Sequence, residues 1–143
     1  MKLQVWDTPF AETLFPGVAV APDAECSNCV SVVVSPSGID QYPKYILRFE
    51  PFGAYRCDDE SLASIESFNT VARSGSASTY KWEGSPWLEQ FVKDSGGLAN
   101  SYHGKPLEHF VILGGDLNVD VLAPNPPTVE VVNEPRVLCE YRV

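Results

Sequence analysis

The chain has 143 residues, of which 44% are hydrophobic and 11% aromatic, a composition that indicates one globular domain and argues against a largely disordered chain. Its longest apolar runs, such as Val30–Val34, are far shorter than the roughly 20 residues that a transmembrane helix needs. Nineteen acidic residues against ten basic ones give a formal net charge of −9, so nucleic acid and anionic membrane surfaces are not expected as partners.

The N-terminal segment MKLQVWDTPFAETLF carries one lysine, but Asp7, Pro9 and Glu12 interrupt its apolar part. A secretory signal needs a continuous apolar stretch after its basic residues, so none is predicted here. We therefore expect a soluble cytoplasmic protein whose thiols are reduced.

Cys26 and Cys29 form the one C-x-x-C spacing of the chain. A redox pair would need this motif at the start of a helix, whereas here it runs into VSVVV, a predicted strand. A zinc site would need two further ligands, and the available residues contain no second close pair: Cys57, Cys139, His103 and His109. Buried or incidental cysteines are the favoured interpretation, and Cys26, Cys29 and His109 remain the candidate metal ligands. No cofactor is expected.

Two segments in the first half of the chain have the patterns of β-strands. CVSVVVSP, residues 29–36, is rich in β-branched residues and ends at a turn signal. In the longer segment 43–57, Tyr45, Leu47 and Phe49 alternate with Lys44, Ile46, Arg48 and Glu50, so one face of the strand is apolar and the other largely charged. The proline and glycine of EPFG interrupt this strand and predict a bulge or a bend.

Two helices are predicted. The first covers DDESLASIESFNTVA, residues 58–72, with Asp58 as its cap and apolar residues at helical spacing. The second follows the strand-like STYKWEG and begins at Ser85, the N-cap, with Pro86 at the first helical position. Its apolar stripe and its last turn lead to the glycines at 96 and 97, which end it.

The segment His109–Ala123 predicts a β-hairpin. HFVIL and VDVLA are strand-like runs, and the glycines and asparagine of GGDLN suit a five-residue loop between them. Asp116 is then expected at the tip of the loop, and Asp120 on the solvent side of a strand that has one buried face. PTVEVV and RVLCEYRV predict two further strands. Together the elements predict a single α+β domain over residues 1–143, with an antiparallel or mixed β-sheet and two helices packed on one face.

No known catalytic pattern is present. The chain lacks GxSxG, GxxxxGK[ST], GxGxxG and HExxH. His109 as a general base or metal ligand would need partners from elsewhere in the fold, which the sequence does not name. The favoured interpretation is a histidine at the end of a strand whose ring covers part of the helix or sheet.

FEPFGAYRCDDES, YKWEGSPWLEQF and HFVILGGDLNVDVLA resemble small uncharacterised bacterial proteins, which share a W-x-x-S-x-W-L strand-to-helix junction and two late paired strands. The residues that carry the resemblance are Trp82, Ser85, Trp87, Leu88, His109, Phe110, Asp116 and Val121–Ala123. It spans roughly the last two-thirds of the chain, and the segment with Cys26 and Cys29 lies outside it. Some small acidic proteins of this class look like immunity proteins of toxin systems. The resemblance implies a small α+β interaction domain and adds no catalytic residue.

Three functions fit these observations, and a non-enzymatic one is favoured. The first is an acidic binding protein of bacterial origin, in the form of an immunity-type inhibitor of a basic toxin; its candidate contacts are Glu108, Asp116 and Asp120. The alternative is a small metal- or ligand-binding enzyme that uses His109 with carboxylates or with the thiols of Cys26 and Cys29. The third is a structural subunit of a homo-oligomer, joined through a sheet edge or the face around Trp87.

Overall fold

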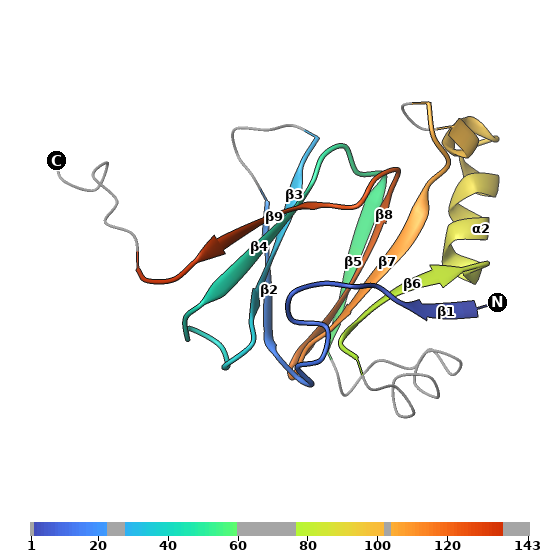
Figure 1. The fold of residues 1–143 in the computed structure, drawn as a ribbon. Coiled ribbons are helices and arrows are strands. Elements are labelled where there is room, and N and C mark those ends of the chain that lie inside the picture. The colour runs from blue at the N-terminus through green and yellow to red at the C-terminus, as the bar shows by residue number, and fades with distance from the viewer. Residues whose placement is uncertain (1, 23–27, 60–76, 102–103, 136–143) are drawn as a thin grey trace, which may run out of the picture.

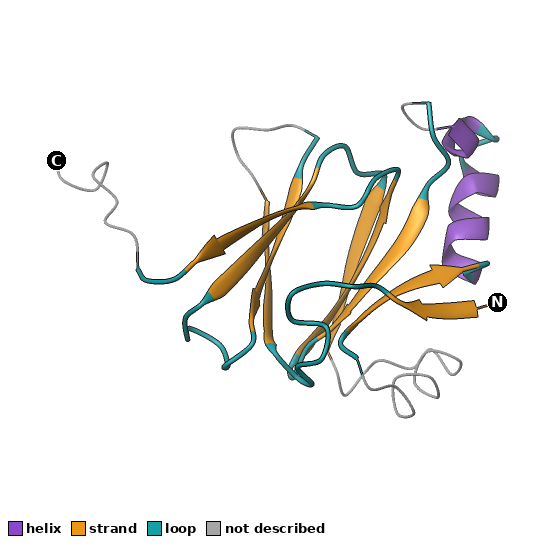
Figure 2. Cartoon of the chain, viewed as in Figure 1, coloured by secondary structure: helices purple, strands orange, loops and turns teal. Residues whose placement is uncertain are grey.

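The computed structural model describes residues 2–22, 28–59, 77–101 and 104–135. They form two antiparallel β-sheets that pack face to face, with helices against one of them (Figures 1 and 2). The five-stranded sheet has the order β1 (Lys2–Val5), β6 (Thr79–Glu83), β7 (Glu108–Leu113), β8 (Leu117–Ala123) and β5 (Ala54–Asp59). The four-stranded sheet has the order β2 (Gly17–Pro22), β3 (Val30–Ser35), β4 (Lys44–Phe49) and β9 (Thr128–Val132).

Helix α2 (Pro86–Asp94) and the short 3-10 helix η2 (Leu98–Ser101) complete the described elements. The predicted start of α2 is confirmed: the Ser85 hydroxyl accepts a hydrogen bond from the Leu88 backbone N–H at 3.0 Å, and Pro86 is the first helical residue. Each of these features satisfies or removes a backbone donor that a helix start leaves unpaired.

The predicted α+β fold with two helices is wrong. The described residues form nine strands in two antiparallel sheets and a single α-helix, which is a mostly-β architecture. Asp58 and Asp59, predicted to open the first helix, extend strand β5 instead, and the rest of that predicted helix lies outside the described residues. Strands β1 and β2, which were not predicted from the sequence, add to the β content.

The segment EPFG does not bend one strand within a sheet; it carries the chain between the two sheets. β4 belongs to the four-stranded sheet and β5 to the five-stranded sheet. The hydrophobic alternation was read correctly on each side of the break, since Leu47 and Phe49 are both fully buried. What the alternation could not report is which neighbour each strand pairs with.

Between the two sheets lies the main hydrophobic core. Alternate residues of β7 and β8 point into it, opposite the inward side chains of β3 and β4. Its buried members are Trp6, Phe10, Val18, Val30, Val32, Val34, Leu47, Phe49, Phe110, Ile112, Val119, Val121 and Ala123. Packing of this kind is what two apolar sheet faces require in order to leave water.

The other face of the five-stranded sheet is also covered. Trp87, Leu88, Phe91 and Val92 of helix α2 pack against a buried cluster formed by Ala99, Leu107 and, from strand β8, Leu122. Figure 2 shows the helices against this sheet only. The middle of strands β7 and β8 is therefore buried on both faces, so His109 and Asp120 cannot reach solvent, whereas Glu108 at the start of β7 stays partly exposed. No helix among the described residues is long and apolar enough to cross a membrane.

The hairpin predicted for His109–Ala123 is confirmed by the pairing of β7 with β8, from Glu108 opposite Ala123 to Leu113 opposite Asn118. The loop is shorter than the predicted five residues, because Leu117 and Asn118 already belong to strand β8. The strand predicted at 29–36 and the one predicted at PTVEVV correspond to β3 and β9. RVLCEYRV lies outside the described residues.

Candidate functional site

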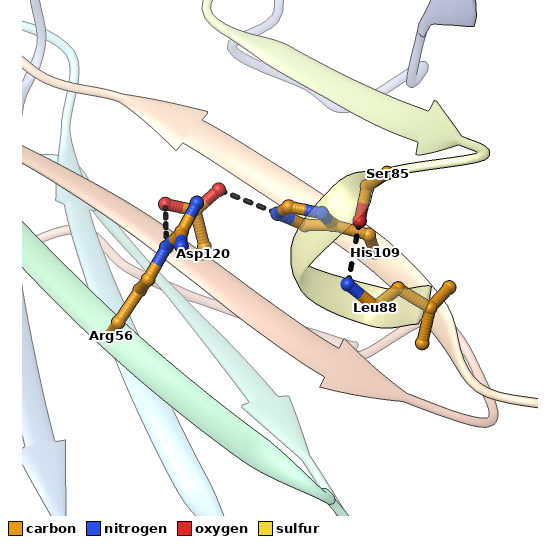
Figure 3. Close-up of polar contacts among 5 residues, drawn as sticks. All are labelled: Arg56, Ser85, Leu88, His109 and Asp120. Atoms are coloured by element: carbon orange, nitrogen blue, oxygen red, sulfur yellow. Dashed lines mark hydrogen bonds and ion pairs between the residues drawn. The ribbon is translucent and has the colours of Figure 1, made fainter. Parts of the chain in front are cut away.

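Arg56, His109 and Asp120 form a charged cluster on the face of the five-stranded sheet that helix α2 covers (Figure 3). Nε2 of His109 lies 2.6 Å from Oδ1 of Asp120, and Nε of Arg56 lies 3.3 Å from Oδ2 of the same carboxylate. Arg56 donates its Nε–H to the carboxylate of Asp120, whose other oxygen contacts the imidazole. Asp120 is thus the centre of the cluster.

Strand register brings these three residues together. Arg56 of β5 is directly opposite Asp120 of β8, which makes an opposite-charge cross-strand pair. Asp120 is also opposite Val111 of β7, two residues from His109, so the imidazole reaches the carboxylate along a diagonal of the same face. The cluster therefore depends on the pairing of three strands.

Two tryptophans hold the imidazole in place. The ring of Trp82, from β6, stacks on His109 with centroids 5.3 Å apart, and the ring of Trp87, from α2, meets it edge-on at the same distance. The guanidinium carbon of Arg56 lies 4.3 Å from the centre of the Trp87 ring, a cation–π contact. Trp87 consequently contacts two members of the cluster and ties α2 to the sheet.

The cluster is closed to solvent on the side of the imidazole. The side chains of His109 and Asp120 are 0% and 2% exposed, and that of Arg56 is 27% exposed. Nδ1 of His109 has no hydrogen-bond partner among the described residues. A general base must come within hydrogen-bond reach of a substrate proton, and an imidazole enclosed by two indole rings and a helix does not do so in this conformation. The geometry suits anchoring of the helix more than proton transfer.

The structure corrects the predicted position of Asp120. It was expected on the solvent side of a strand with one buried face, but it is 1% exposed, because α2 covers that face. Glu108 is half-buried and lies 3.6 Å from Lys81. Asp116 is exposed at the tip of the β7–β8 loop, as predicted. Of the three candidate partner contacts, only Asp116 is both exposed and without an ion pair in the described part of the chain.

The predicted role of the imidazole ring is close to what is found: His109 packs between the sheet and the helix. The sequence did not identify Arg56 or the two tryptophans as its companions. Trp82 and Trp87 stood in the strand-to-helix junction that the sequence singled out, but Arg56 is 64 residues from Asp120. A local pattern carries no signal for a contact at that separation.

The two described cysteines differ in oxidation state: Cys29 is in a disulfide and Cys57 is a free thiol. Cys29 is disulfide-bonded, so the expectation of reduced thiols is wrong at this position. Its sulfur accepts a hydrogen bond from Nη2 of Arg48 at 3.6 Å. Cys26 lies outside the described residues. Within the described segments, no group of three His, Cys, Asp or Glu side chains is arranged to hold a metal ion.

Cys57 is a free thiol near the cluster. Partial burial raises its pKa, and the carboxylates of Asp58 and Asp120 raise it further. A raised pKa keeps the group in the thiol form at neutral pH, whereas nucleophiles and metal ligands use the thiolate. The environment of Cys57 therefore suits an inert side chain.

The outer surface of the described residues is strongly acidic. Four half-buried basic side chains are each ion-paired with an acid: Lys44, Arg48, Arg56 and Lys81. The exposed basic residues in the described segments are Lys93 and Lys105. The exposed acids there are Asp7, Glu12, Asp40, Glu50, Glu83, Glu89, Asp94, Asp116, Glu130 and Glu134. Exposed acids therefore far outnumber exposed basic residues in the described segments, where four of the basic side chains are held in ion pairs.

No protein-family model matches the chain, and neither the curated proteins nor the solved structures compared with it include a match. The function is therefore argued from the geometry and the charge of the chain itself.

Proposed function

We propose that this chain is a non-enzymatic binding protein whose acidic surface holds a basic protein partner. The observation that carries the proposal is the distribution of charge: the described acids lie mainly in solvent, whereas most described basic side chains are engaged by acids of the same chain. Unpaired surface charge of one sign attracts a partner of the other sign and speeds its encounter.

The enclosed cluster of Arg56, His109 and Asp120 also supports a non-enzymatic function. His109 and Asp120, the residues best suited to acid–base chemistry, are bonded to each other and covered by aromatic rings. Their geometry anchors helix α2 to the sheet and leaves a substrate no access in this conformation. An immunity-type inhibitor, which neutralises a basic toxin by covering part of its surface, is the particular form of binding protein that we propose.

The test is capture from an extract of the source cells at low ionic strength, followed by reconstitution. Proteins retained on the immobilised chain are eluted with salt and identified; each basic protein is then purified and titrated against the free chain. We expect a saturable complex whose affinity falls steeply as salt increases, because exposed charges are screened. If no basic protein forms a stoichiometric complex with the purified chain at low ionic strength, the proposal is wrong.

A further inference from the structure

Three loops meet at one end of the sandwich, the lower end in Figure 1. They are the loop between β1 and β2, the turn between β3 and β4, and the β7–β8 loop. The backbone N–H of Gly115 donates to the carbonyl of Pro16 at 2.8 Å, which joins the first loop to the third. A Cβ on Gly17 would lie 2.6 Å from the backbone nitrogen of Ile39, so the second loop is equally close to the first.

Large apolar side chains project from this end into solvent. Leu14 is 50% exposed, Phe15 71% and Ile39 55%. Single exposed apolar residues are ordinary on protein surfaces, but a group of them on adjoining loops marks a site of interaction. Leu98, which is 83% exposed on η2 at the other end of the molecule, is an example of the ordinary kind.

Acidic residues share these loops with the apolar side chains. Glu12, Asp40 and Asp116 are exposed on the same three loops. Lys44 lies beside the β3–β4 turn, 3.9 Å from Asp40, and offsets part of the local negative charge, whereas no ion pair within the described residues involves Glu12 or Asp116. We call the side chains of Glu12, Leu14, Phe15, Ile39, Asp40 and Asp116 the loop-end surface.

The backbone at Phe15 is strained. Its φ is +57°, in the left-handed region that bulky side chains rarely adopt. Because Phe15 is 71% exposed, burial within the chain offsets little of this strain. Strained backbone of this kind concentrates at functional sites such as ligand clamps and switch regions. The chain thus holds an aromatic ring outward at a cost to its own stability.

We infer that the loop-end surface is the docking site for a basic protein partner, which contacts Phe15 with an apolar side chain and the acids on the same loops with lysines or arginines. This inference rests on the proposed function and names the surface that carries it. An apolar centre within a charged rim is the usual anatomy of a protein–protein interface, and aromatic residues are frequent among its strongest contacts. A second copy of this chain would oppose acid to acid on the same surface.

The probe for the test is a fluorescein-labelled cationic peptide of lysine and leucine residues, followed by fluorescence anisotropy at low ionic strength. Two control peptides replace leucine by serine and lysine by glutamate. We expect the lysine–leucine peptide to bind more tightly than either control. Phe15→Asn is expected to weaken its binding at least about tenfold, since truncation of a central aromatic contact has an effect of this size, whereas Leu98→Asn leaves it within about twofold.

Phe15→Asn also reports whether any loss arises from unfolding. Asparagine tolerates positive φ, so this variant is expected to unfold at a denaturant concentration no lower than the parent. Asp116→Lys is expected to weaken binding and to flatten its salt dependence more than Glu89→Lys, a matched charge reversal on α2.

The outcomes distinguish a failure of the proposed docking site from a failure of the proposed function. If the lysine–leucine peptide binds with strong salt dependence but Phe15→Asn and Leu98→Asn behave alike, the loop-end surface is not the site, and the proposed function stands. If light scattering shows a dimer of the chain that Phe15→Asn dissociates, the surface is occupied by a second copy and the inference is wrong. If neither the cationic peptides nor any basic protein binds, the proposed function itself fails.

Discussion

Arg56, His109 and Asp120 lie beneath helix α2, whereas Glu12, Asp40 and Asp116 project into water from loops at one end of the sandwich. In the first region each charge has a partner from the same chain, at distances set by strand register. In the second region the charges share three loops with exposed apolar side chains, and of the three acids only Asp40 has an ion pair in the described part of the chain, with Lys44. Burial makes pairing obligatory, because a buried charge without a partner is costly. The charges that remain free are those that can act on another molecule.

The largest expected effect in the enclosed region comes from Asp120→Ala. It leaves Arg56 and His109 without the carboxylate that joins them, and removal of one partner of a buried charged pair lowers the free energy of unfolding by about 3 kcal/mol. Denaturant unfolding at neutral pH measures it. The loss should persist at high salt, because buried pairs are screened much less than exposed ones.

Asp116→Ala is the matched control for this prediction. It removes an exposed carboxylate from the adjoining loop of the same hairpin, and its effect on the free energy of unfolding should lie within about 0.5 kcal/mol. Equal effects of the two substitutions would contradict the distinction between an enclosed and an exposed region.

A smaller effect is expected from Ser85→Ala, which removes the side-chain cap of the helix that covers the cluster. Substitution of a serine N-cap by alanine lowers the free energy of unfolding by about 1 kcal/mol. Ser37→Ala, at an exposed turn position, serves as the comparison and should change it by less than about 0.5 kcal/mol. A loss at Ser85 no larger than at Ser37 would show that the cap hydrogen bond contributes nothing to seating α2.

The smallest effect concerns Cys57, at the border of the enclosed region. Because partial burial and two carboxylates raise the pKa of its thiol, less thiolate is present at neutral pH than in an unfolded chain. Iodoacetamide should therefore label Cys57 more slowly in the folded protein than after denaturation, and the rate should rise as the pH is increased. Peptide mass spectrometry follows this position separately from the other cysteines.

Asp58→Asn tests whether the neighbouring carboxylates contribute to the raised pKa of Cys57. It removes one of the two carboxylates and should speed labelling of Cys57 in the folded state while leaving the denatured rate unchanged. If folded and denatured protein are labelled at the same rate in the parent chain, the environment of this thiol does not raise its pKa.

Local signals in the sequence were read correctly wherever neighbouring residues decided the outcome. The cap at Ser85, the alternation that buries Leu47 and Phe49, and the hairpin around Asp116 are all found in the structure. The fold class was predicted wrongly because the break at EPFG can mean either a bend or a passage between sheets, and no local pattern distinguishes these. For the same reason, local patterns did not identify Arg56 as a member of the cluster, since it lies 64 residues from Asp120 in the sequence.

By itself, the sequence determined the strand alternation of individual segments, the start of helix α2 and the large excess of acid. Those features depend on residues a few positions apart or on composition. The tertiary structure decided the environment of Asp120, the closure of His109 between two tryptophans and the meeting of three loops around Phe15. Each of these depends on strand pairing and on which face a helix covers, and such contacts join residues too far apart in the chain for a periodic pattern to specify them.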